Sequence, residues 1–137
     1  MFRKLDESIS VAGQVTARDI ADAAAQGFTA VINNRPDGEQ PGQPAGSEIE
    51  AAARAAGLDY TAIPVTHAGF NDAQAAAMRD ALAAARGPVL AYCRTGTRST
   101  LLWALARAKM GDRAESLQSK AAAAGYDLSP ILPLLHP

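Results

Sequence analysis

Short apolar runs alternate along the chain with longer stretches in which apolar residues recur at helical spacing, and glycine or proline marks most junctions. The apolar runs predict strands over residues 8–12, 28–33, 58–65 and 89–92. The longer stretches predict helices over residues 16–27, 47–57, 71–86, 99–110 and about 113–124, followed by a proline-punctuated tail. Capping residues precede three of these helices: Thr16, Ser47 in a capping-box-like start, and Asn71 or Asp72.

The alternation of strands and helices predicts an α/β fold with parallel strands, right-handed crossovers and helices on both faces of the sheet. Ligands bind open sheets of this kind at the carboxyl ends of the strands. Three loops follow strand ends and are therefore expected to converge. They span residues 33–39, 66–71 and 93–98.

The composition fits one domain covering residues 1–137, because 48% hydrophobic content is enough for a real core. A net charge of −1 with dispersed basic residues gives no reason to expect nucleic acid or an anionic membrane as a partner. One cysteine, no signal-like N-terminus and no long apolar stretch favour the cytoplasm. The two histidines, His67 and His136, show no ligand spacing with the cysteine, so no metal or other cofactor is expected, and His136 is interpreted as tail.

The most informative segment is Cys93-Arg-Thr-Gly-Thr-Arg98-Ser99, which lies between a predicted strand and a predicted helix. The helix dipole and the inward-pointing N–H groups of such a turn favour a thiolate and a bound oxyanion. We expect Cys93 to be the nucleophile and Arg98 to supply a planar fork for a sulfate- or phosphate-like group. The residues expected to line the anion loop are Arg94, Thr95, Gly96, Thr97 and Ser99. The alternative is a small buried core cysteine beside solvated arginines.

A second polar loop follows the predicted strand 28–33. Arg35 could add a second positive group to the pocket, with Asp37 or Glu39 holding it, and Asn34 could line the same pocket. The alternative is an ordinary turn, because Arg35-Pro-Asp-Gly is good turn chemistry without any ligand. Trp103 is expected to be a core residue.

Three segments together resemble the beta-lactamase-hydrolase-like, phosphatase-like domain family. They are Val31–Glu39, Tyr60–Val65 and Cys93–Ser99 followed by Leu102-Trp-Ala. The resemblance implies a protein-tyrosine-phosphatase-like fold with a central, mostly parallel sheet of about four to five strands. Family members are described as phosphatases or as sulfur transferases. Some are fused to persulfide dioxygenase-type modules, which implies such a module as a partner.

Three details bear on the choice between the two reactions, and the first two concern the loop itself. Tyrosine and dual-specificity phosphatases have His-Cys, five residues and then Arg, whereas Tyr92 precedes Cys93 here and only four residues separate Cys93 from Arg98. A smaller loop leaves less room for a tetrahedral phosphoryl group. Rhodanese-type sulfurtransferases, which have an unrelated fold, use a loop of this shorter size, often Cys-Arg-x-Gly-x-Arg-Ser.

The general acid is the third detail. Dual-specificity phosphatases often place an aspartate two residues after an Ile-Pro-Val strand end, and His67 occupies that position here. His67 could donate a proton, Asp72 could substitute for it, or His67 could simply face solvent. Transfer of sulfane sulfur needs no such acid.

Three functions therefore stay open. The leading hypothesis is a sulfurtransferase that forms a persulfide on Cys93 and passes sulfur to an acceptor thiol. The second is a phosphatase with a Cys93 thiophosphate intermediate. The third is a module that senses anions or persulfides without catalysis. The expected partners are a small sulfur or phosphorus oxyanion and an acceptor thiol.

Overall fold

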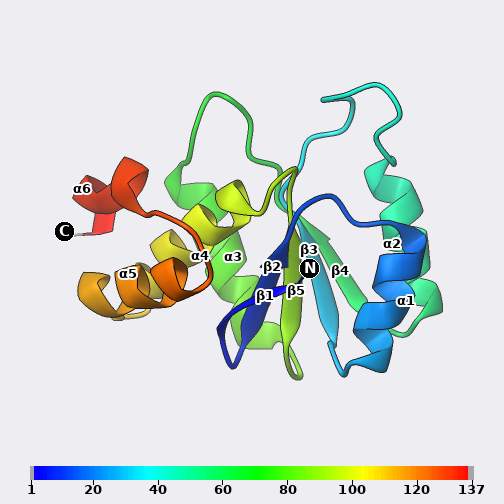
Figure 1. The fold of residues 1–137 in the computed structure, drawn as a ribbon, viewed down its shortest axis with the longest axis horizontal. Coiled ribbons are helices and arrows are strands. Elements are labelled where there is room, and N and C mark those ends of the chain that lie inside the picture. Colours follow the sequence, from blue (N-terminus) through cyan, green and yellow to red (C-terminus); the bar gives the residue numbers. More distant parts are fainter. Residues whose placement is uncertain (1, 136–137) are drawn as a thin grey trace.

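A five-stranded sheet runs through the computed structural model, which describes residues 2–135 (Figure 1). The strands are β1 (Arg3–Asp6), β2 (Ile9–Ala12), β3 (Ala30–Asn33), β4 (Asp59–Ala62) and β5 (Val89–Tyr92). Their order across the sheet is β1-β2-β5-β3-β4. The last four are parallel to one another, and β1 pairs antiparallel with β2. The predicted mostly parallel sheet is thus confirmed.

Helices cover both faces of the sheet, as predicted. They are α1 (Ala17–Ala25), α2 (Gly46–Ala55), α3 (Asp72–Ala84), α4 (Thr97–Lys109), α5 (Ala114–Ala123) and α6 (Leu132–Leu135), with a 3₁₀ turn at Ser129–Ile131. Figure 1 places α1 and α2 on one side of the sheet and α3 to α6 on the other. Two hydrophobic clusters correspond to these sides.

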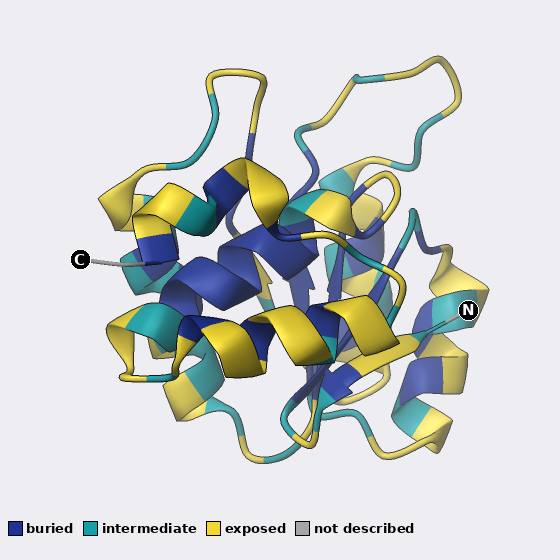
Figure 2. Cartoon of the chain, turned by 60° about the vertical axis from the view of Figure 1, so that its left-hand side comes forward, coloured by how far each residue is buried: buried dark blue, intermediate teal, exposed yellow. Residues whose placement is uncertain are grey.

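The helix α4 lies in the centre of the larger cluster. Its residues from Ser99 to Ala106 are all buried, and Trp103 is completely enclosed, as expected for a core residue. Figure 2 shows the buried colour over most of this helix. A helix that is buried all round is held by packing on every side, so its first turn is a rigid platform for the Cys93 loop.

Three details differ from the sequence prediction. Strand β1 was not predicted, because Leu5 is its one apolar residue and the pattern is that of a polar edge strand. Helix α4 begins at Thr97 rather than Ser99. The capping box predicted at Ser47 is wrong: α2 begins at Gly46 with no side-chain cap of its own, and the Asp37 carboxylate accepts a hydrogen bond from the Gly46 N–H at 2.8 Å.

The C-terminal tail predicted after residue 124 contains the 3₁₀ turn and α6. His136 lies outside the described residues. Within residues 2–135, no helix is long and apolar enough to cross a lipid bilayer.

Candidate active site

The Cys93 loop joins the central strand β5 to the start of α4. All four residues of β5 are buried, and the strand pairs with parallel neighbours on both sides, so the position of Cys93 is tightly defined. Gly96 is the N-cap of α4 and has a φ of +90°, in the left-handed region that favours glycine. The N-cap residue provides no side-chain cap, and the Thr97 N–H makes only a long hydrogen bond, 3.5 Å, to Thr95 Oγ1.

The sulfur of Cys93 is enclosed by this loop. Cys93 is a free, fully buried cysteine, and its Sγ accepts a hydrogen bond from the Gly96 N–H at 3.1 Å. A backbone N–H aimed at sulfur stabilises the thiolate more than the thiol. The loop and the helix start therefore direct a backbone N–H at the Cys93 sulfur.

The Arg98 side chain is held in a fixed position by a carboxylate from the loop after β3. Its Nη1 and Nη2 donate to the two oxygens of Glu39 at 2.7 and 2.8 Å, and Nη1 also donates to the Val65 carbonyl at 2.8 Å. The hydrogen bonds from Arg98, with a further one from Arg35, lower the pKa of Glu39 to about 2. In turn Glu39, and to a lesser extent the charge on Cys93, raise the pKa of Arg98. Arg98 is therefore a permanent cation beside the sulfur.

Arg35 lies behind Glu39, and it also contributes to the lining of a neighbouring pocket of about 460 Å³ that includes Asp37 and Tyr60. Its side chain is only 2% exposed, and its Nε donates to Glu39 Oε1 at 2.9 Å. The other two nitrogens donate to Gln14 Oε1 and Gln40 Oε1, each at 2.9 Å. The expectation that Glu39 holds Arg35 is met, whereas Asp37 caps α2 instead. Arg35 thus acts on the site through Glu39, because its guanidinium is surrounded by protein acceptors.

Asn34 and Ser99 link the end of β3 to the start of α4. The Ser99 hydroxyl donates to Asn34 Oδ1 at 2.8 Å, and Asn34 Nδ2 donates to the Ile63 carbonyl at 2.9 Å. Both residues are fully buried. Since the Ser99 proton is used by Asn34, this pair positions the loop and does not face an anion in this structure.

The outer side of the loop is polar and exposed. Thr95 Oγ1 donates to Thr97 Oγ1 at 3.1 Å, and both residues are exposed, as is Arg94. The structure shows no ion pair for the Arg94 side chain with any of residues 2–135. Arg94 is therefore a free cation at the outer side of the loop.

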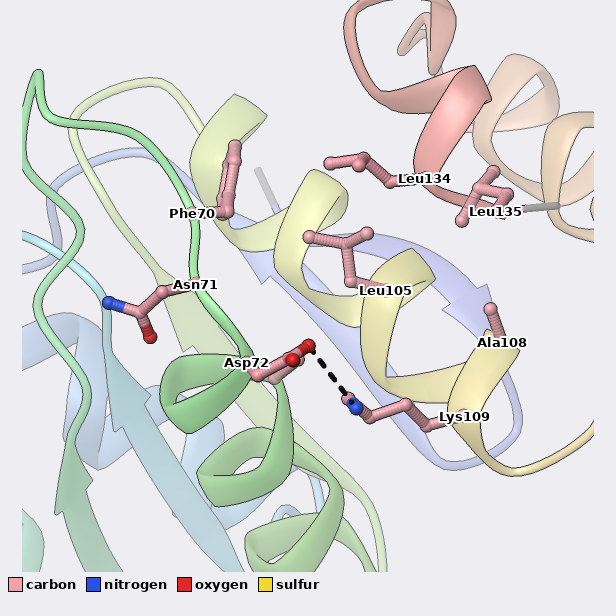
Figure 3. Close-up of a pocket in the computed structure, with 9 residues that line it drawn as sticks. Phe70, Asn71, Asp72, Leu105, Ala108, Lys109, Leu134 and Leu135 are labelled. Carbon is pink, nitrogen blue, oxygen red and sulfur yellow. Dashed lines mark ion pairs between the residues drawn. The ribbon is translucent and has the colours of Figure 1, made fainter. Parts of the chain in front are cut away.

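The two candidate acids lie in different surroundings. His67 is exposed in the loop that follows Val65, whose carbonyl accepts from Arg98. Asp72 forms an ion pair at 3.4 Å with Lys109, the last residue of α4, beside an apolar pocket of about 600 Å³ (Figure 3). A 13-residue helix is about 20 Å long, and the Cys93 loop lies at its other end. The structure does not bring Asp72 to the sulfur.

Tyr92, which replaces the histidine of phosphatases, does not belong to the loop either. It packs in the cluster between the sheet and the helices α1 and α2. Burial raises the pKa of Tyr92 far above its ordinary value, so its phenol stays neutral.

Sequence reasoning missed three residues at the site. Gln14 follows β2, whose carboxyl end lies at the same edge of the sheet, so a fourth strand-end loop was a usable signal. Gln40 and Tyr126 gave no signal. Tyr126 contacts the loop from beyond α5, where its Oη donates to the Thr95 carbonyl at 3.1 Å. Within residues 2–135, no three His, Cys, Asp or Glu side chains gather into a possible metal site.

The sequence of this chain is similar to that of known phosphatase-like domains. Residues 1–110 match the family described as beta-lactamase hydrolase-like protein, phosphatase-like domain. A beta-lactamase hydrolase-like protein of Agrobacterium fabrum is 43% identical over 108 residues, which are 79% of this chain and 25% of the relative. One of Xylella fastidiosa is 35% identical over 125 residues, which are 90% of this chain and 29% of the relative. The chain thus spans about a quarter of the length of these curated relatives.

Solved structures give the fold independently. A crystal structure described as a putative phosphatase from Neisseria meningitidis is 35% identical, with a TM-score of 0.85 over 98% of this chain and 96% of that one. The active form of Tk-PTP has a TM-score of 0.73 at 17% identity and covers 98% of this chain and 92% of its own. The likeness to Tk-PTP shows the phosphatase-like fold alone.

Proposed function

The chain belongs to the phosphatase-like domain family of beta-lactamase hydrolase-like proteins. From the chemistry of its site we propose that it is a sulfurtransferase with Cys93 as its nucleophile. The observation that supports this choice is the lack of a carboxylic acid at the sulfur. Among the described residues, Glu39 is the carboxylate that contacts the loop, and two arginines keep it ionised.

The missing acid matters differently to the two reactions. Hydrolysis of an unactivated phosphate ester needs a proton donor for the leaving oxygen, whereas a thiolate or sulfite leaves without protonation. Asp72 is paired with Lys109 and Asp37 caps α2, so neither carboxylate is the proton donor, and His67 is the remaining candidate. The site is therefore better suited to sulfur transfer.

The size and burial of the loop support the same reaction. Four residues separate Cys93 from Arg98, and the sulfur is buried beneath the Gly96 N–H. A terminal sulfane sulfur is a single atom, whereas a phosphoryl group carries three oxygens into the loop. A small loop accommodates the first more easily.

The reaction proceeds in two displacements. The Cys93 thiolate attacks the outer sulfur of thiosulfate, the S–S bond of the donor breaks, and sulfite leaves with its electron pair. The product is a Cys93 persulfide, whose terminal sulfur accepts hydrogen bonds from N–H groups in the first turn of α4. An acceptor thiolate then attacks that terminal sulfur and releases the Cys93 thiolate, so no external oxidant or reductant is consumed.

The two arginines of the loop have different tasks in this scheme. Arg98, fixed by Glu39 and Val65, places a constant positive charge beside the sulfur. Arg94 is exposed and unpaired with any described acid, so it is free to bind the departing sulfite or a carboxylate of the donor.

A phosphatase is the second candidate, favoured by the 35% identical neighbour described as a putative phosphatase. Cys93 would then form a thiophosphate, Arg98 would bind the phosphoryl oxygens, and His67 would be the acid. Aryl phosphates with good leaving groups need the acid least.

The test is a steady-state assay of both reactions with wild type and Cys93→Ser. We expect wild type to transfer sulfur from thiosulfate or glutathione persulfide to a thiol acceptor, and Cys93→Ser to transfer none. Phosphate release from an aryl ester by wild type alone, without sulfur transfer, would assign the domain to the phosphatases. Binding of sulfate without turnover of any of these compounds would leave the sensing function.

A further inference from the structure

The Tyr126 side chain reaches the Cys93 loop from a distant part of the chain. Its Oη donates to the Thr95 carbonyl at 3.1 Å, and a Cβ added to Gly96 would collide with the same hydroxyl. Tyr126 therefore lies directly against the peptide that joins Thr95 to Gly96. It also lies outside residues 1–110, the part of the chain that matches the family.

The contact involves the same peptide unit that binds the sulfur. A trans peptide is planar, so the Thr95 C=O and the Gly96 N–H point in opposite directions. The C=O accepts from Tyr126, and the N–H donates to Cys93 Sγ at 3.1 Å. The tyrosine hydroxyl and the cysteine sulfur thus hold the two ends of one peptide plane.

Rotation of this peptide plane would give an alternative turn type. Type I and type II turns differ by rotation of one peptide plane, and glycine tolerates the dihedral angles on both sides of that change. Gly96, at a φ of +90°, is such a glycine. A flipped peptide would aim the Thr95 carbonyl oxygen at the sulfur, where its partial negative charge would oppose a thiolate.

Tyr126 is itself held in place by the end of α5 and by Arg3. Its N–H donates to the Ala121 carbonyl at 2.9 Å at the end of α5. The Arg3 guanidinium lies 5.7 Å from the centre of the tyrosine ring, and Arg3 Nη1 donates to the Ala124 carbonyl at 3.0 Å. Burial raises the pKa of Tyr126, so its hydroxyl keeps its proton at neutral pH.

We propose that Tyr126 is a positioning residue that locks the Thr95–Gly96 peptide with its N–H aimed at Cys93 and thereby maintains the thiolate. The hydrogen bond to the C=O also polarises the peptide, which strengthens its N–H as a donor. The inference rests on the part of the proposed function in which Cys93 reacts as a thiolate, and it requires no particular sulfur donor.

The experiment is a pH titration of Cys93 by the ultraviolet absorbance of its thiolate, with Cys93→Ser as the blank. This readout does not require a reagent to reach the buried sulfur. We expect Tyr126→Phe, which removes only the hydroxyl, to move the titration midpoint upward by about half a pH unit to one unit, a three- to tenfold loss of thiolate. The melting temperature is measured alongside.

Tyr60→Phe is the matched control. Tyr60 is another partly exposed tyrosine, its hydroxyl accepts from Asn33 Nδ2 at 3.0 Å, and it packs in the hydrophobic cluster on the opposite side of the sheet from Tyr126. An unchanged midpoint in Tyr126→Phe, or an equal shift in Tyr60→Phe, would overturn the proposal. The titration midpoint of Cys93 could shift as expected in Tyr126→Phe although wild type transfers no sulfur. That result would support the positioning role of Tyr126 and reject only the proposed sulfurtransferase.

Discussion

The helices α3 and α4 each follow a loop that begins at the carboxyl end of a parallel strand, yet the N–H groups of their first turns are satisfied differently. Asn71 and Gln74 form a reciprocal capping box at α3, so the donors there are satisfied by the helix's own side chains. Gly96 begins α4 with no side-chain cap. Its N–H instead donates to the sulfur of Cys93.

The charges around the two helix starts differ as well. Asp72 at the start of α3 is 97% exposed and pairs with one lysine at 3.4 Å. Near α4, Glu39 accepts from both Arg98 and Arg35 at 2.9 Å or less, and its own pKa falls to about 2. The comparison teaches that a helix start is available for chemistry where its cap is missing and its charges are fixed by buried partners.

Among the changes near the start of α4, substitution of Arg98 should have the largest effect on the rate of sulfur transfer. We expect Arg98→Lys to slow sulfur transfer by about 100-fold, because lysine keeps the charge but cannot bridge both oxygens of Glu39. Arg107→Lys is the matched control, since Arg107 makes a similar two-point contact with Asp112 in the last turns of α4. Equal rates for the two variants in the steady-state assay would contradict the assigned role.

Alanine at the two glycines before these helices should separate loop geometry from backbone strain. Gly96 and Gly69 have φ values of +90° and +93°, but a Cβ at Gly96 would meet the Tyr126 hydroxyl, and one at Gly69 would meet nothing within 4 Å. We expect Gly69→Ala to lower the free energy of unfolding by about 1 kcal/mol and Gly96→Ala by about 2 kcal/mol or more. Urea unfolding measures both.

The same pair also has a functional readout. Sulfur transfer should persist in Gly69→Ala and be lost in Gly96→Ala, whose loop must shift away from Tyr126. Retention of full activity by Gly96→Ala would show that the loop does not depend on this close contact.

Acidification should lower the stability of the protein because it protonates Glu39, which pairs with Arg98 near the start of α4. Its folded-state pKa is lowered from 4.5 to about 2, so its stabilising contribution is complete above pH 4.5 and is lost as the pH falls toward 2. Glu39→Gln should cost about 2 kcal/mol at pH 7, and the difference from wild type should shrink steadily below pH 4.5. Urea unfolding at a series of pH values follows this directly, and a constant difference would contradict the ion-pair account.

Asp112→Asn offers a control for this effect. Hydrogen bonds from Arg107 also lower the pKa of Asp112, so its loss should reduce stability in the same direction. Asp112 lies just beyond the end of α4 that is opposite Cys93, so sulfur transfer should be unchanged in Asp112→Asn, whereas Glu39→Gln should slow it.

Much of this arrangement could be predicted from local sequence. The continuous apolar run Val89–Tyr92 matches β5 in every residue, and the glycine-containing turn after it locates Cys93 at a helix start. Parallel topology then predicts that the loop around Arg35 comes close, and Glu39 indeed meets Arg98. These predictions succeeded because the pattern of apolar residues, the turn residues and the parallel strand topology all indicate the same arrangement.

The rest depends on contacts that sequence spacing does not encode. Asp72 is five residues from His67 in sequence, but the packing of α3 on α4 turns it toward Lys109. The sequence left open whether Arg35 binds an anion or belongs to an ordinary turn, and only the tertiary structure shows three acceptors around its guanidinium. Tyr126 approaches the loop from 31 residues away, where no local pattern indicates a role.

The most direct measurement is the intact mass of wild type and Cys93→Ser after incubation with thiosulfate, without an acceptor thiol. The account predicts that wild type gains the mass of one sulfur atom, that Cys93→Ser gains none, and that an added thiol removes the gain. No gain on wild type with thiosulfate or a persulfide donor would contradict a Cys93 persulfide, and with it the proposed sulfur transfer.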